Sequence, residues 1–150
     1  MSPKRRHPAH PTPVNDRDRP TMLLVTVCVQ DRRPLLARPA THDLLRQCWA
    51  DADRWLVGRY IIMPDHLHLF CSPADPGTSL KSWMEFWRAS FTRQWTHTAD
   101  KPIWQKEFWD TQLRHGESYA AKWVYVRNNA VASGLVTDVD AWPFPDGKTI

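Results

Sequence analysis

The alternation of hydrophobic and polar side chains along the chain predicts four β-strands. The clearest is Met22–Gln30, which is rich in β-branched residues and places every second side chain on one face. Trp55–Met63 and His66–Ser72 are separated by a short proline-containing turn, and this spacing predicts an antiparallel hairpin. Phe108–Leu113 is the fourth predicted strand.

Hydrophobic residues at helical spacing predict three helices. The first begins with Thr41 as its N-cap, and the second runs from Ser79 to about Thr96. The third opens after Gly116 and ends at Gly134, a residue type that commonly follows a helix C-terminus. The second helix is predicted to bury Leu80, Trp83, Met84, Trp87, Phe91 and Trp95. The third is predicted to bury Tyr119, Trp123, Val126 and Ala130.

The resulting element order, β-α-β-β-α-β-α, matches the ferredoxin-like pattern with one added C-terminal helix. The predicted class is α+β, with one antiparallel sheet that carries helices on one face and leaves the other face available. We expect a single catalytic domain over residues 21–145, because 150 residues form one core of ordinary size. Residues 1–20 are predicted to be a flexible, basic, proline-rich arm, and residues 146–150 a tail.

Composition narrows the class of protein. Hydrophobic residues make up 42% and charged residues 24%, which is typical of a globular domain. No run of about 18 apolar residues occurs, so we expect neither a membrane span nor a signal peptide. Cys28, Cys48 and Cys71 are odd in number and lack C-x-x-C spacing, which argues against a zinc ribbon and a disulfide framework. Reduced thiols and a cytoplasmic location are predicted.

The net charge of +4 is unevenly distributed. Residues 1–19 carry five basic and two acidic side chains, and a second basic surplus lies between Lys81 and Arg127. This pattern is compatible with nucleic-acid binding, although a solvated tail explains the first surplus equally well. The candidate DNA contacts are Lys4, Arg5, Arg6, Lys81, Arg88, Arg93, Lys106, Arg114, Lys122 and Arg127.

Two histidines in one predicted strand are candidate metal ligands. His66 and His68 are two residues apart, so their side chains share one face of the strand. The opposite face carries Leu67, Leu69 and Cys71. Neutral imidazole is the commonest protein ligand for a divalent ion, so the pair is plausible as half of a metal site. A structural histidine pair is the alternative.

The last predicted helix offers complementary chemistry. Tyr125 and Asn129 lie four residues apart, so they stack on one side of the helix beside its buried stripe. A tyrosine can act as a nucleophile that forms a covalent intermediate, and an amide oxygen suits a hard cation. The alternative for Tyr125 is a packing role.

Three motifs together resemble one family. They are M-P-D-H-L-H-L at 63–69, W-Q-K-E-F-W-D at 104–110 and Y-V-R-N-N-A-V-A-S-G-L-V at 125–136. In this order and spacing they are similar to the REP-associated tyrosine transposases, within the single-tyrosine group of HUH endonucleases. The resemblance covers roughly residues 21–143.

The resemblance implies a ferredoxin-like enzyme that cleaves and rejoins single-stranded DNA at REP-like hairpins. By the same resemblance, His66, His68 and Asn129 would bind Mg²⁺ or Mn²⁺, and Tyr125 would form a 5′-phosphotyrosine intermediate. It also favours a monomer over a dimer, located in the cytoplasm with the nucleoid and away from membranes. Two alternatives remain: a non-cleaving module that binds DNA hairpins, alone or within a regulatory complex, and a phosphodiesterase that uses water.

The chain departs from the family pattern at two positions. Ala130 follows Asn129 where the family usually has proline, which leaves the helix uninterrupted and bears on how Tyr125 is presented. Asp65 stands where many relatives carry Asn or Glu, and we expect this difference to be minor.

Overall fold

The computed structural model describes residues 22–113, 119–132 and 145–147, and its centre is one antiparallel sheet. The strand order is β4-β1-β3-β2-β5. The first four strands are β1 (Leu23–Val29), β2 (Trp55–Ile62), β3 (His66–Pro73) and β4 (Trp104–Gln112). All four were predicted, and their order with two crossing helices is the ferredoxin-like arrangement that the element order indicated.

The fifth strand was not predicted. β5 (Pro145–Gly147) pairs with β2, with Arg59 opposite Gly147 and Ile61 opposite Pro145. It overlaps the segment expected to be a tail, and three residues that include proline and glycine carry no alternating pattern by which to find them. The predicted arm at residues 1–20 lies outside the described residues, so the domain limits stay a prediction.

The three predicted helices are confirmed as α1 (Pro39–Asp51), α2 (Leu80–Gln94) and α3 (Tyr119–Ala132). Thr41 is not the N-cap of α1, because the helix begins two residues earlier at a proline, a residue favoured in the first helical turn. Its buried hydroxyl instead donates to the Leu35 carbonyl at 3.4 Å. Within the described residues, no helix is long and apolar enough to cross a membrane.

The main core lies between the sheet and the helices α1 and α2. Trp87 is fully buried near its centre and contacts Trp49 and Trp104, with ring centroids 5.8 and 5.4 Å away. The buried stripe predicted for α2 is confirmed, including Trp95 just beyond the helix end. The three cysteines are buried thiols outside any disulfide, as predicted.

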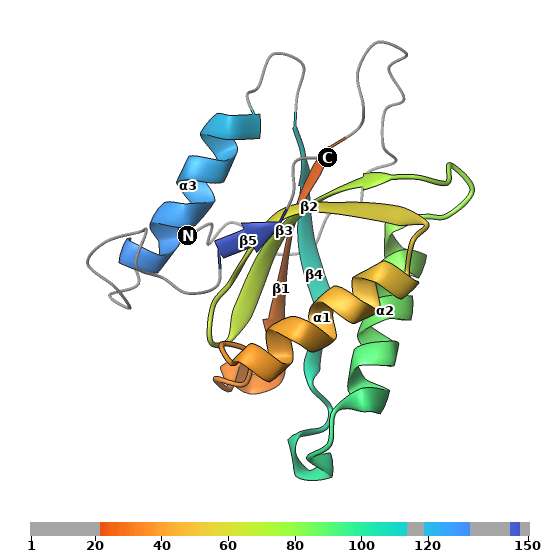
Figure 1. The fold of residues 1–150 in the computed structure, drawn as a ribbon, viewed down its shortest axis with the longest axis vertical. Helices are drawn as coiled ribbons and strands as arrows, with labels where there is room; N and C mark the ends of the chain where they lie inside the picture. Colours follow the sequence, from red (N-terminus) through yellow and green to blue (C-terminus); the bar gives the residue numbers. More distant parts are fainter. Residues whose placement is uncertain (1–21, 114–118, 133–144, 148–150) are drawn as a thin grey trace.

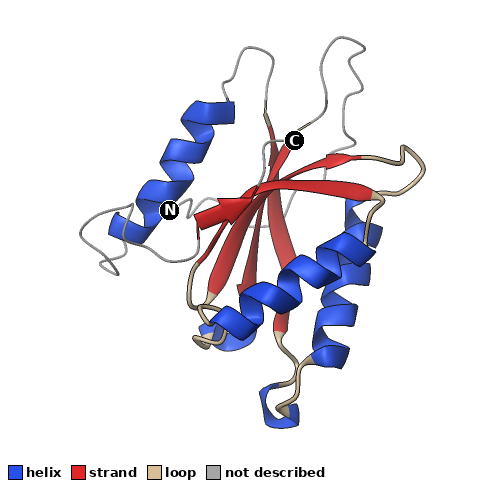
Figure 2. Cartoon of the chain, in the orientation of Figure 1, coloured by secondary structure: helices blue, strands red, loops and turns tan. Residues whose placement is uncertain are grey.

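A second core covers the opposite face of the sheet, where α3 packs (Figure 1). Its members are Met22, Ile61, Met63, Phe70, Trp123 and Val126, with Leu24 and Leu113 against them. Two of the side chains predicted to be buried on α3, Trp123 and Val126, are thus confirmed. The expectation that this face stays available is wrong, because Ile61 and Phe70 lie on it and are buried there. The sheet therefore lies between two layers of helix (Figure 2).

Arg88 was predicted to contact DNA, and that prediction is wrong. Its side chain is buried, with 9% of the residue exposed. Nε donates to the Met84 carbonyl at 3.1 Å and Nη1 to the Gln105 carbonyl at 2.9 Å, while the guanidinium lies 5.2 Å from the centre of the Phe108 ring. Arg88 therefore ties α2 to β4, and spacing alone did not show that so long a side chain folds back into the protein.

We expect Arg88→Ala to lower the free energy of unfolding by about 2–3 kcal/mol, because it removes hydrogen bonds from a charged donor to buried carbonyls. Arg93→Ala is the matched control on the exposed side of the same helix, and its effect should stay within about 0.5 kcal/mol. Urea denaturation measures both. Equal effects in the two variants would contradict the assignment of Arg88 to the core.

Candidate active site

The two histidines project together from β3. Leu67, Leu69 and Cys71 are fully buried in the main core, so the alternation of the strand turns the imidazoles to the face covered by α3. The ring centroids of His66 and His68 lie 5.0 Å apart, with the ring planes at 85°. The structure thus brings together the predicted pair.

Each imidazole is held through its Nδ1 atom. A hydrogen bond of 2.8 Å joins His68 Nδ1 to the hydroxyl of Thr26, its cross-strand partner on β1. His66 Nδ1 lies 2.7 Å from a carboxylate oxygen of Asp65. Metal-binding histidines commonly use one ring nitrogen for such a partner and the other for the ion. The pair therefore fits a metal site in which Nε2 of both rings would be the ligand atoms.

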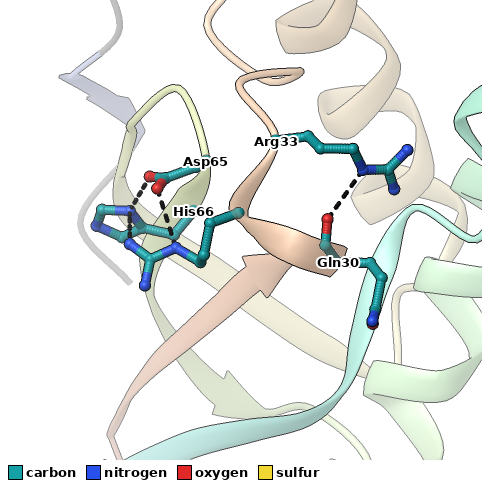
Figure 3. Close-up of polar contacts among 5 residues, drawn as sticks. Gln30, Arg33, Asp65 and His66 are labelled. Carbon is teal, nitrogen blue, oxygen red and sulfur yellow. Dashed lines mark hydrogen bonds and ion pairs between the residues drawn. The ribbon is translucent and has the colours of Figure 1, made fainter.

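Asp65 also contacts an arginine from a separate loop. Arg32 Nε donates to the second carboxylate oxygen at 2.9 Å. Figure 3 shows the Asp65 carboxylate beside His66. Burial raises the pKa of the Asp65 carboxyl, but the hydrogen bonds from His66 and Arg32 outweigh it, so the pKa is lowered overall. Burial lowers the pKa of the His66 imidazole, and Asp65 offsets only part of that effect. His66 is accordingly neutral near pH 7, the state that binds metals.

Tyr125 lies on α3, the helix that covers the histidine face. Trp123 docks this helix, with its ring centroid 6.5 Å from that of Phe70 on β3. Ile61, the cross-strand partner of His68, belongs to the same apolar cluster as Trp123 and Val126. Tyr125 itself is 61% exposed, so it flanks the buried stripe as predicted and is accessible to a large substrate.

The third metal ligand stays a prediction. Asn129 belongs to α3, one turn after Tyr125, and its side chain lies outside the described residues. In the described part of the chain, no three His, Cys, Asp or Glu side chains gather into a metal-binding group. The assignment of Asn129 as a ligand therefore rests on the sequence resemblance and on its position one turn after Tyr125.

The remaining candidate DNA contacts differ in exposure. Lys81, Arg93 and Lys106 are exposed, whereas Lys122 and Arg127 on α3 are partly exposed. Lys4, Arg5, Arg6 and Arg114 lie outside the described residues. The Arg127 guanidinium lies over the Trp123 ring at 5.9 Å from its centre.

Sequence patterns missed two residues that touch the histidine pair. Thr26 follows strand alternation like any other residue of β1, and only the cross-strand register places it beside His68. Arg32 belongs to the turn after β1 and is part of no motif in the sequence. A polar residue on the histidine face of the neighbouring strand was the available signal for Thr26, and no local signal distinguished Arg32 from Arg33.

Comparisons with known proteins add an independent line of information. No family model matches the chain. It is 27% identical over 124 residues to a REP-associated tyrosine transposase of Escherichia coli K12, covering 79% of this chain and 72% of that protein. It is also 27% identical over 94 residues to a candidate REP-associated tyrosine transposase of Haemophilus influenzae, covering 55% of this chain and 53% of that protein.

Two solved structures share the fold. One is a REP-associated tyrosine transposase bound to a REP hairpin, with a TM-score of 0.70 and 24% identity over 96% of this chain and 81% of that chain. The other is a transposase candidate from Deinococcus radiodurans, with a TM-score of 0.52 and 14% identity over 71% of this chain and 88% of that chain. These two likenesses show a shared ferredoxin-like fold. The chain is related to the REP-associated tyrosine transposases, which confirms the resemblance drawn from its motifs.

The lowered pKa of His66 predicts how stability depends on pH. The pKa of an unperturbed histidine is 6.5. Below that pH the unfolded chain binds a proton at this residue more readily than the folded protein does, so the free energy of unfolding decreases as the pH is lowered. We expect His66→Asn to lose less stability than the wild type between about pH 7.5 and about pH 5.5. Urea denaturation in a chelator at both pH values measures the difference. An identical loss in both proteins would contradict the direction of the pKa shift.

Proposed function

We propose that this chain is a metal-dependent endonuclease and strand transferase that acts on single-stranded DNA at REP-like hairpins. The observation that carries the proposal is the pair of adjacent imidazoles whose Nδ1 atoms are both engaged, at 2.8 and 2.7 Å, under the helix that bears Tyr125. This substrate class is supported by the similarity of the chain to REP-associated tyrosine transposases and by a protein of the same fold that is bound to a REP hairpin.

The protein would hold the ion through Nε2 of His66 and His68, with the Asn129 amide as third ligand. A bound Mg²⁺ or Mn²⁺ would supply Lewis-acid polarisation of the scissile phosphate and would orient it. Nitrogen ligands favour Mn²⁺ in affinity, whereas the amide oxygen suits either ion. The Thr26 and Asp65 contacts restrict rotation of both imidazole rings, so the ligand atoms would be positioned before an ion arrives.

Tyr125 would act as the nucleophile. Its phenol oxygen would form a bond to phosphorus while the bond from phosphorus to the 3′-oxygen breaks, and the phenol proton leaves as the departing oxygen becomes a 3′-hydroxyl. The 5′-phosphate would then remain on Tyr125 as an ester. Since that ester preserves the energy of a phosphodiester bond, attack by another 3′-hydroxyl would rejoin strands and release the tyrosine. The exposure of Tyr125 is compatible with attack on a polynucleotide.

Basic side chains near the nucleophile would bind the DNA backbone. Lys122 and Arg127 lie on α3 within one turn of Tyr125, and both keep part of their surface exposed. Contacts of this kind release counterions, so binding should weaken steeply with salt. They carry no sequence information, which the hairpin must supply through its shape and unpaired bases.

The central test is covalent capture of DNA. Wild-type protein incubated with Mn²⁺ and a single-stranded REP-type hairpin oligonucleotide should yield a protein–DNA adduct on a denaturing gel. Tyr125→Phe should lose the adduct, because the ring without its hydroxyl cannot form the ester. Tyr119→Phe, on the same helix, is the matched control and should retain it. Cleavage that survives in Tyr125→Phe would instead indicate a phosphodiesterase that uses water, and hairpin binding without cleavage by the wild type would indicate a binding module.

Dependence on the metal separates binding from chemistry. His68→Ala should abolish the adduct, as should a chelator added to the wild type, while hairpin affinity measured by fluorescence anisotropy should change by less than about fivefold, since phosphate contacts supply most of the binding energy. An unchanged adduct yield in His68→Ala would rule out the histidine pair as the metal site.

A further inference from the structure

We infer that Arg32 and Asp65 form a positioning pair that keeps the His66 proton on Nδ1 and directs Nε2 to the metal. The inference rests on the proposed role of His66 as a metal ligand. It adds two residues, Arg32 and Asp65, that would support this ligand without binding the metal themselves. Asp65 was expected to be a minor departure from the family pattern, and no sequence motif includes Arg32.

Each oxygen of the Asp65 carboxylate has a hydrogen-bond partner. One oxygen lies 2.7 Å from His66 Nδ1, and the other accepts from Arg32 Nε at 2.9 Å (Figure 3). An ionised carboxylate only accepts hydrogen bonds, so His66 Nδ1 must be the donor in this contact. Since a neutral imidazole has one proton, Nε2 then carries the lone pair that a metal requires.

A competing contact does not change this assignment. Arg32 Nη2 lies 3.5 Å from His66 Nδ1, and a guanidinium can only donate, so that contact would require Nδ1 to be unprotonated. It is 0.8 Å longer than the contact of Nδ1 with the carboxylate, which is in the range of strong charge-assisted bonds. The shorter bond therefore determines the tautomer.

Arg32 limits what Asp65 can do. A carboxylate with a free oxygen beside a cation can rotate and become a ligand itself, which would alter the geometry of the site. Arg32 occupies that oxygen, so Asp65 stays an orienting group. Because the Arg32 side chain is 53% exposed, the ion pair contributes little to global stability, and orientation is the more substantial consequence.

The backbone holds Arg32 in this place against a conformational cost. Asp31 and Arg32 have φ of 60° and 55°, a left-handed conformation that is unfavourable for residues other than glycine. Two backbone bonds of 2.9 Å fasten this loop to the turn before β3, from Val29 N to the Asp65 carbonyl and from Leu36 N to the Pro64 carbonyl. The turn thus directs Arg32 to the histidine.

The neighbouring Arg33 has a different task, which makes it a control. Its Nε donates to the Gln30 carbonyl at 2.9 Å, and its Nη2 donates to the Pro102 carbonyl. Both acceptors are backbone groups away from Asp65, and Figure 3 shows this side chain directed away from the carboxylate. Two adjacent arginines of equal charge are therefore separable by substitution.

The first test observes the tautomer in metal-free protein. In ¹⁵N-labelled histidine spectra at about pH 8, where His66 is neutral, wild-type His66 should carry its proton on Nδ1. Asp65→Ala should move the proton to Nε2, and Arg32→Ala should weaken the protected Nδ1 proton signal through faster exchange. Arg33→Ala should resemble the wild type, with Arg54→Ala as a second control distant from the site. An Nδ1 signal unchanged in Asp65→Ala, or lost equally in Arg32→Ala and Arg33→Ala, would overturn the inference.

The second test measures Mn²⁺ alone by isothermal titration calorimetry. Asp65→Ala should weaken Mn²⁺ binding about 10–100-fold, the usual effect of removing a partner of a metal-bound histidine. Arg32→Ala should give a smaller loss, and Arg32→Lys should recover part of it. Full affinity in Asp65→Ala with normal wild-type binding would overturn the positioning pair and leave the proposed function intact. Absence of Mn²⁺ binding in the wild type would overturn the metal site itself, whatever the tautomer spectra show.

Discussion

The register between β1 and β3 is the constraint on which the candidate site depends. It sets Thr26 opposite His68 and Cys28 opposite His66, while Leu67 and Leu69 enter the main core. Because side chains alternate along a strand, a slip of one residue would turn both imidazoles into the main core and the leucines to the face that α3 covers. The hydrophobic effect that stabilises the core therefore also fixes where the imidazoles point, and the same register supplies the Thr26 hydroxyl to one of them.

The helix α3 completes this arrangement by a second, smaller set of apolar contacts. Trp123 packs on Phe70 and lies under the guanidinium of Arg59, 5.4 Å from its ring centre. These contacts dock the helix that bears Tyr125 over the histidine face. Among the residues that the structure describes, this second core has fewer members than the core beneath α1 and α2. The proposed nucleophile, Tyr125, is thus carried by this helix and not by an element of the main core.

Periodicity predicted the elements that obey it, and contacts between distant segments account for what it missed. The four main strands and the buried face of α2 follow from alternation and helical spacing, and the two histidines follow from the alternation of β3. Helical spacing predicted Arg88 on the surface, whereas in the fold its guanidinium donates to a backbone carbonyl of a distant segment, at Gln105. The covered face was not predicted, because the apolar residues Ile61 and Phe70 share it with two polar histidines. Arg32 reaches Asp65 across 33 positions of sequence, which no local pattern encodes.

The position of a bound metal ion tests the proposed site most directly. Crystals of the full chain grown with Mn²⁺ and a hairpin oligonucleotide, and measured at a wavelength where manganese scatters anomalously, would locate it. The account predicts an anomalous peak bonded to Nε2 of both His66 and His68, with the Tyr125 oxygen at the scissile phosphate beside it. A peak elsewhere, or Tyr125 remote from the ion with no second subunit supplying its own tyrosine, would contradict it.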